Sequence, residues 1–241
     1  MQPLCPWDGF DRATMEFCER PLCAWVTQPS NTWSNVGYLL VGALVLRLAM
    51  REDKFHLSPI GWSAIAVGLG STFFHASTTF VGEVFDIGAM FLFAVYWLTV
   101  DLHRLLGWSS RVQRSFYASV MVLSIVALLV QRTAGVAIFT AQITATFIIE
   151  IALRRRAKSA RRKGLHPPHV DYKPLVKLSG MFLLAYTAWR LDYHRVLCVR
   201  DFHLLSGHAM WHLLNASCFY FLYRFFHQFP GRLRENAKVQ E

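Results

Sequence analysis

Seven apolar runs, each about 18 to 23 residues long, restrict what this chain can fold into. A transmembrane helix needs about 20 consecutive apolar residues, so each run is long enough to cross a bilayer. The chain is 54% hydrophobic and only 17% charged, and its runs lack the alternation of a transmembrane β-barrel. The sequence therefore predicts an all-α, integral membrane bundle of seven transmembrane helices. The predicted spans are approximately 32–50, 58–77, 83–105, 114–131, 134–153, 174–192 and 206–226.

The net charge of +10 is concentrated in particular loops. Most of the 25 lysines and arginines follow the first, third, fifth and seventh predicted spans, and the densest run lies at 154–163. Basic loops stay in the cytoplasm, so we expect a cytoplasmic C-terminus and an N-terminus that lies outside or in a lumen. We interpret the basic run as a topology determinant that contacts anionic lipid, not as a nucleic-acid site.

The order of the runs predicts three parts of the chain. Residues 1–31 form an extramembrane N-terminal cap, residues 32–228 form the seven-helix domain, and residues 229–241 form a cytoplasmic tail. The N-terminal stretch contains acids and lacks the apolar core of a signal peptide, so we expect no cleavage there.

Four of the five cysteines fall on the predicted outer side, where oxidation is possible. They are Cys5, Cys18, Cys23 and Cys198. Either Cys18 or Cys23 could pair with Cys198 and so tie the cap to the loop before the last span. Cys218 lies in that span, where we expect it to pack.

Five polar residues within the apolar runs lie at one predicted depth. His208 and His212 are one helical turn apart at the start of the last span, so they share one helix face. His75 ends the second span, Ser71 precedes it by one turn, and Asp86 stands just inside the third. With the orientation above, all five lie in the outer leaflet. Ionisable side chains inside a membrane span are costly and usually mark a functional site.

The three histidines predict a zinc site. Three imidazoles with one open position are the ligand set of a catalytic zinc ion, so we predict that His75, His208 and His212 bind zinc. A single membrane histidine can instead hydrogen-bond a neighbouring helix, but a shared ion explains three at one depth better. Haem is disfavoured because two histidines one turn apart on one helix cannot lie on opposite faces of a porphyrin.

The two other polar residues fit the hydrolysis of an amide, in which zinc polarises the carbonyl and activates water. Asp86 is the candidate general base, which takes a proton from water and passes it to the leaving amine. Alternatively, Asp86 orients a ligand histidine. Ser71 is the candidate hydrogen-bond donor to the oxyanion of the tetrahedral intermediate, unless its hydroxyl bonds back to its own helix.

This pattern resembles that of the alkaline ceramidases, part of a wider superfamily of seven-helix membrane hydrolases that includes the adiponectin-receptor relatives. The resemblance covers all seven spans, FCE at 17–19, SNTWSN at 30–35, Ser71-x3-His75, Asp86 and His208-x3-His212. It implies a seven-helix bundle with an intramembrane zinc ion. It also implies the hydrolysis of ceramide, a membrane lipid, to a sphingoid base and a fatty acid.

The resemblance further implies a calcium site in the cap, where the eukaryotic members carry an acidic stretch and a later glutamate. Glu16 and Glu19 match the acidic stretch, whereas Gln28 stands where the later acid is expected. Calcium needs several hard oxygen ligands. The two acids are therefore either calcium ligands or part of a solvated cap.

Two other functions fit parts of the pattern. An adiponectin-receptor-like membrane receptor would use a mainly structural zinc, although the short predicted tail offers no docking domain. A transporter would use Asp86 and the histidines as a proton relay, but such proteins have broken helices and internal repeats that are not evident here. We therefore expect a zinc-dependent hydrolase that acts on a linear amide bond of a lipid.

Overall fold

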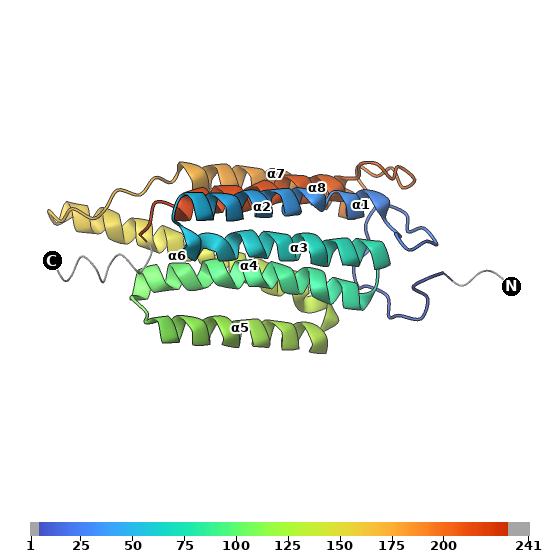
Figure 1. Cartoon of the computed structure of the whole chain (residues 1–241), viewed down its shortest axis with the longest axis horizontal. Helices are drawn as coiled ribbons and strands as arrows, with labels where there is room; N and C mark the ends of the chain where they lie inside the picture. The colour runs from blue at the N-terminus through green and yellow to red at the C-terminus, as the bar shows by residue number, and fades with distance from the viewer. Residues whose placement is uncertain (1–4, 231–241) are drawn as a thin grey trace. The chain divides into compact units, whose positions relative to one another are not determined.

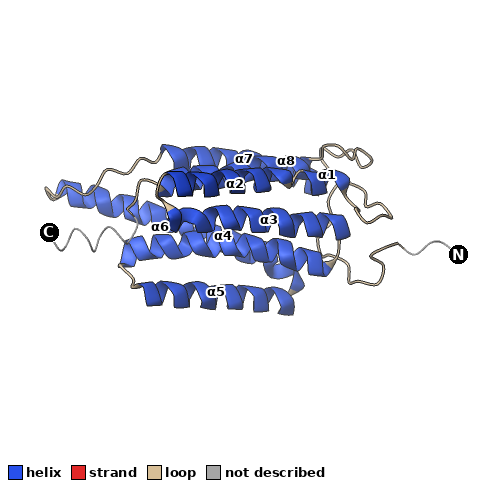
Figure 2. Cartoon of the chain, viewed as in Figure 1, coloured by secondary structure: helices blue, strands red, loops and turns tan. Residues whose placement is uncertain are grey.

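A computed structural model describes residues 5–230, and within this range the chain is helical without any β-strand (Figure 1). Figure 2 shows the same chain by secondary structure, with helices joined by loops. The all-α prediction is confirmed for this range. Residues 1–4 of the predicted cap and 231–241 of the predicted tail lie outside the described residues. The helices are α1 (Pro29–Trp33), α2 (Val36–Arg51), α3 (Ser58–Ser77), α4 (Phe80–Leu106), α5 (Ser110–Val130), α6 (Gly135–Arg162), α7 (Lys173–Tyr193) and α8 (Gly207–Phe226), with 3-10 turns η1 (Phe55–Leu57) and η2 (Arg132–Ala134).

The chain divides into two compact units. In the described range, the first unit contains residues 5–86 and 171–230, and it therefore includes the cap, α1 to α3, the start of α4, α7 and α8. The second unit contains residues 87–170, with the rest of α4, α5 and α6. Helix α4 passes from the first unit to the second after Asp86.

Within the described range, 5 helical segments are long and apolar enough to cross a membrane. They correspond to the first five predicted spans. The last two predicted spans form α7 and α8, which are 21 and 20 residues long but are not among these segments. Both carry polar side chains along their length, such as Lys177 and Arg190 in α7. The five segments are Pro29–Arg51, Phe55–Ser77, Phe80–Leu106, Ser110–Val130 and Arg132–Arg162.

Within the first unit, α2 packs against both α3 and α8, and α7 packs along α8. Two glycines allow α2 and α3 to approach closely, because a Cβ at Gly42 would lie 2.9 Å from the main-chain oxygen of Gly61. Gly70 does the same for the start of α4. A Cβ at Gly70 would lie 2.7 Å from the main-chain oxygen of Phe85, so any larger residue would separate α4 from α3 here.

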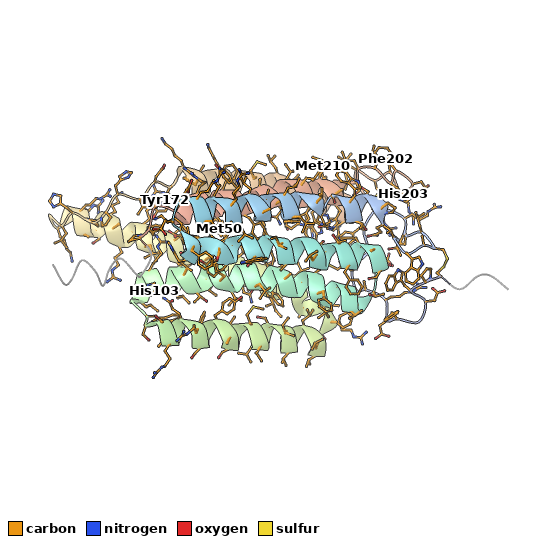
Figure 3. All side chains as sticks on the ribbon, in the orientation of Figure 1. Met50, His103, Tyr172, Phe202, His203 and Met210 are labelled. Carbon is orange, nitrogen blue, oxygen red and sulfur yellow. A yellow bond between two sulfur atoms is a disulfide. The ribbon has the colours of Figure 1, made fainter. Side chains whose placement is uncertain are left out.

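The two ends of the first unit are distinct. Met50 at the end of α2 and Tyr172 just before α7 lie toward one end, whereas His203 and Met210 lie toward the other (Figure 3). Helix α8 therefore starts at the end opposite to the start of α7. This arrangement brings the start of α8 to the end of the unit where the cap lies.

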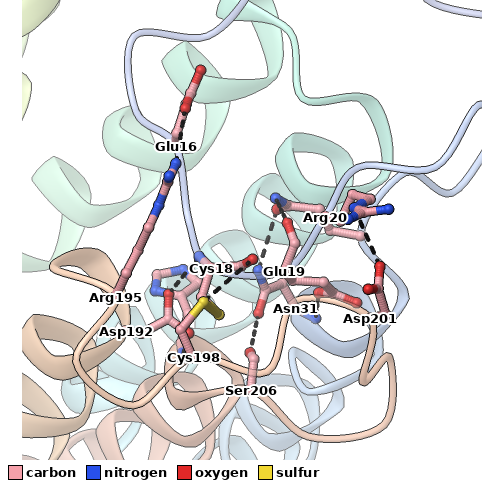
Figure 4. Close-up of a disulfide and its surroundings, with 12 residues drawn as sticks. Glu16, Cys18, Glu19, Arg20, Asn31, Asp192, Arg195, Cys198, Asp201 and Ser206 are labelled. Atoms are coloured by element: carbon pink, nitrogen blue, oxygen red, sulfur yellow. Dashed lines mark hydrogen bonds and ion pairs between the residues drawn. A yellow bond between two sulfur atoms is a disulfide. The ribbon is translucent and has the colours of Figure 1, made fainter.

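Two disulfides hold the cap. Cys18 pairs with Cys198 in the loop between α7 and α8, and Cys5 pairs with Cys23 inside the cap. The predicted tie between the cap and this loop is confirmed, with Cys18 as the partner (Figure 4). Cys218 is buried in α8 and unpaired, as the sequence predicts.

The second unit contains a buried group of charges. The Arg104 guanidinium donates to Asp101, one turn away on α4, at 2.8 Å, and to Glu150 on α6. The Asp101 and Glu150 side chains are 0% and 3% exposed. Around them the helices pack through apolar contacts, including the edge of Trp97 against Phe147. We call Asp101, Arg104 and Glu150 the charged triad.

Candidate metal centre

The three predicted zinc ligands come from two helices of the first unit. His75 lies in the last turn of α3, and His208 and His212 occupy the first two turns of α8. The Ser206 hydroxyl caps α8 by accepting from the amide of Ala209, which determines where the helix begins. All three imidazoles are buried, and one ligand nitrogen from each lies within 4.8 Å of the others. The structure therefore brings the three residues together, and we call them the histidine cluster.

The geometry of the histidine cluster suits a metal ion. The Nε2 atoms of His75 and His208 are 3.1 Å apart, and Nε2 of His212 lies 3.3 Å from the Ser71 hydroxyl. Tetrahedral zinc with bonds of about 2.0–2.1 Å separates two ligand nitrogens by roughly 3.3 Å. Imidazole nitrogens that face each other at this spacing can share a cation between their lone pairs. The cluster can therefore bind a metal ion.

Two of the imidazoles are held through their other ring nitrogen. His75 Nδ1 lies 2.8 Å from Oε1 of Gln28, and His212 Nδ1 lies 2.8 Å from the Ser34 hydroxyl. Gln28 and Ser34 are both buried. A histidine that binds a metal usually donates its second ring N–H to an oxygen, which fixes the ring orientation. Gln28 and Ser34 occupy the positions of such oxygens.

His208 is held in a different way. Asp192 at the end of α7 accepts from the main-chain amides of His208 at 3.1 Å and of Cys18 at 2.9 Å, so one carboxylate joins the cap to the start of α8. The Phe17 ring stacks on the His208 imidazole, with ring centroids 3.8 Å apart. His208 Nδ1 is buried and has no hydrogen-bond partner within residues 5–230.

Ser71 and Asp86 lie beside the histidine cluster. Ser71 is buried, its hydroxyl lies 3.3 Å from Nε2 of His212, and the Asp86 carboxylate lies near this hydroxyl. Asp86 reaches this position because α4 begins in close contact with α3. A Cβ at Gly70 would lie 3.2 Å from the Cα of Asp86. A carboxylate, a hydroxyl and three imidazoles therefore share one buried site.

The two acids of the predicted calcium site have separate partners, as Figure 4 shows. Glu16 is exposed and pairs with Arg195 at 3.5 Å. Glu19 is fully buried, and its carboxylate accepts from two main-chain amides in α1 and from His203 Nδ1 at 2.9 Å. Calcium takes about six to eight oxygen ligands, whereas the oxygens of Glu19 are surrounded by N–H groups. The calcium site that the resemblance implies stays a prediction.

The sequence pattern assigns no role in the metal centre to Gln28, Ser34 or Asp192. Gln28 stands out in the sequence only because an acid is expected there. Ser34 belongs to the polar stretch 30–35. Several polar residues just before an apolar run are the sequence signal that could have indicated buried hydrogen bonds here. His203 has the sequence position of an ordinary loop residue, but the structure pairs it with the buried Glu19.

Similarity to known proteins extends over the whole of this site. The model of the family described as Ceramidase matches residues 9–239, nearly the entire chain. The matched range contains most of the cap, the histidine cluster, Ser71 and Asp86, so the match does not rest on one short motif. No curated protein matches the chain. The chain therefore belongs to the ceramidase family.

Proposed function

We propose that this protein is a zinc-dependent membrane hydrolase that cleaves the amide bond of ceramide to give a sphingoid base and a fatty acid. Membership of the ceramidase family implies a hydrolase that acts on the amide bond of this lipid. One observation carries the proposed metal dependence. Three buried imidazoles present their ligand nitrogens to one another within 4.8 Å, beside a carboxylate and a hydroxyl.

Zinc is the metal we propose for the histidine cluster. Three imidazoles are a ligand set of catalytic zinc, whereas calcium and magnesium prefer oxygen ligands. His75, His208 and His212 would hold the ion, with Gln28 and Ser34 orienting two of the rings. When bound, zinc supplies a Lewis acid that polarises a carbonyl and activates water at neutral pH.

Asp86 is proposed as the general base. Hydrolysis adds water to the amide carbon and breaks the C–N bond, so one proton must move from water to the leaving nitrogen. The Asp86 carboxylate takes that proton and later delivers it to the amine. Ser71, whose hydroxyl neighbours both Asp86 and His212, is proposed to donate a hydrogen bond to the oxygen that becomes negative.

We also propose that seven helices cross the membrane, with the N-terminus outside or luminal and the C-terminus cytoplasmic. Helices α7 and α8 would complete the five apolar segments, since both pack in the first unit with α2. Residues 1–31 then form the outer cap, 32–228 the helical domain and 229–241 the cytoplasmic tail. The histidine cluster lies under the cap, where the amide of a lipid in the outer leaflet can reach it while the acyl chains stay among the helices.

The test is a product analysis of the purified protein with a panel of ceramides. We expect equal amounts of sphingoid base and free fatty acid, lost when a chelator removes the metal and restored by added zinc. Metal content is measured on the same sample. Bound zinc without product from any ceramide or related lipid amide would contradict the activity and favour a receptor with a structural zinc. Protein that binds no zinc would contradict the metal centre itself.

A further inference from the structure

We infer that Gln28 is a positioning residue, whose side-chain amide fixes His75 with its proton on Nδ1 and thereby leaves Nε2 to bind the metal. The inference rests on the proposed metal centre and deepens it. Gln28 is 3% exposed and lies in the cap just before α1. The cap therefore helps to build the metal centre, in addition to covering it.

Hydrogen bonds determine the orientation of the Gln28 amide. Nε2 lies 3.1 Å from the main-chain oxygen of Glu19, which can only accept. Oε1 therefore faces the other way, where it accepts from Nδ2 of Asn31 at 3.2 Å and lies 2.8 Å from Nδ1 of His75. Turning the amide over would place two oxygens against each other at Glu19 and leave buried polar groups unpaired.

His75 must then be the donor in its bond with Gln28. An amide oxygen carries lone pairs but no hydrogen, so the bond requires a proton on His75 Nδ1. A neutral imidazole has one such proton, and Nε2 keeps the lone pair that a metal needs. This Nε2 is the atom that faces His208. Ser34 makes a similar contact with His212, but a hydroxyl can donate or accept and so does not determine the tautomer by itself.

The main chain around Gln28 is held independently of its side chain. The amide of Gln28 donates to the main-chain oxygen of His75 at 3.1 Å, and the amide of Thr27 donates to that of Ala76 at 3.0 Å. The Thr27 hydroxyl also donates to the main-chain oxygen of His75, at 2.9 Å. These bonds keep the segment docked on the end of α3 when only the side chain at position 28 changes.

Three variants separate the bond to the imidazole from the docking of the cap. Gln28→Met removes the acceptor at similar side-chain length. Gln28→Glu keeps an oxygen that can face His75 Nδ1. Thr27→Val removes a bond to the main chain of His75 without touching the ring. For each full-length protein, Zn²⁺ affinity is measured in calcium-free buffer by competition with a chelator, and the absorption spectrum of bound Co²⁺ reports the ligand geometry.

We expect Gln28→Met to bind Zn²⁺ about 10- to 100-fold more weakly than the wild type, the range typical of losing a group that orients a ligand histidine. Its Co²⁺ spectrum should change as well. Gln28→Glu should bind more tightly than Gln28→Met, because one carboxylate oxygen accepts from His75 Nδ1, although the other meets the main-chain oxygen of Glu19. Thr27→Val should keep both the wild-type affinity and the wild-type spectrum.

Wild-type affinity in Gln28→Met would overturn the inference. An equal loss in Gln28→Met and Gln28→Glu would also overturn it, because such a loss does not depend on the acceptor. If Gln28→Met does not fold, Gln28→Glu provides the test. A high Zn²⁺ affinity in Gln28→Glu supports the role of the oxygen. A low affinity in Gln28→Glu, with wild-type affinity in Thr27→Val, refutes that role. The wild-type protein is measured first, and its failure to bind Zn²⁺ would count against the proposed function instead.

Discussion

The two units each bury a group of polar side chains among apolar helices, but the two groups differ in how their members interact. In the first unit, the histidine cluster sets three imidazoles against one another, with two Nε2 atoms 3.1 Å apart. In the second unit, the charged triad sets a guanidinium between two carboxylates. The histidines are alike, whereas the members of the triad have opposite charges.

This difference separates a candidate metal site from a structural ion pair. The Arg104 guanidinium donates to both carboxylates of the charged triad, so each member has a partner of opposite charge within the unit. The imidazoles of the histidine cluster include no such pair of opposite charges, and their facing ring nitrogens suit a shared cation. Burial of polar groups therefore does not by itself identify a metal site; the types of residue that meet there also matter.

The largest effect is expected for His212→Ala, which removes one member of the histidine cluster. We expect Zn²⁺ affinity to fall by more than the roughly 100-fold that accompanies loss of an orienting group, and ceramide hydrolysis to be lost, because a ligand itself is removed. The measurement combines metal content with product analysis. His103→Gln, at the end of α4 in the second unit, is the matched control. Retained zinc in His212→Ala, or zinc loss in the control, would contradict the assigned ligands.

The converse change is Arg104→Met in the charged triad. We expect a loss of about 3–5 kcal/mol in stability, because two buried carboxylates lose their cation. The second oxygens of Asp101 and Glu150 have no partner within residues 5–230, so no other donor compensates there. Zn²⁺ affinity should stay unchanged. Thermal unfolding in detergent, with and without zinc, provides both readouts.

Asp101→Asn is the control for the charged triad. It leaves the guanidinium paired with Glu150, so the loss of stability should be smaller than in Arg104→Met. A loss of zinc in Arg104→Met without a loss of stability would mean that the charged triad serves the metal centre, and the contrast between the two units would fail.

Reduction of the disulfides should weaken the first unit alone, because residues 87–170 contain no cysteine. The bridge between Cys18 and Cys198 closes a separation of 180 residues, and that between Cys5 and Cys23 one of 18. The chain-entropy estimate makes the longer bridge worth about 2 kcal/mol more. The double Cys→Ser variants of the two bridges can be compared by thermal unfolding. A larger effect of the shorter bridge would disagree with this account.

The smallest expected effect is that of calcium. Adding Ca²⁺ should leave the melting temperature unchanged, because N–H groups and His203 already occupy the oxygens of Glu19. Adding Zn²⁺ to metal-free protein should raise it, since a ligand that binds only the folded state stabilises that state. A rise in the melting temperature with Ca²⁺ would show that the cap has a cation site. The acids of the cap would then bind a metal as the histidine cluster is expected to do.

Most of the helical arrangement could be predicted from the sequence. Long apolar runs form helices because every backbone polar group must be paired where water is absent, and α2 to α6 follow the first five runs. The i,i+4 spacing places His208 and His212 on one helix face. Seven crossings stay a prediction, because polar residues, including two members of the histidine cluster, lower the apolarity of α7 and α8.

Apolar periodicity in the sequence predicts the helices, and residue types within them predict the metal ligands. The partners of these residues became evident from the folded chain. Gln28 contacts His75 where an acid is expected, Cys198 pairs with Cys18 and not with Cys23, and His203 pairs with Glu19. The physical reason is that periodicity specifies the face of one helix. Contacts between residues up to 180 positions apart depend on the path of the cap and loops, which no local pattern encodes.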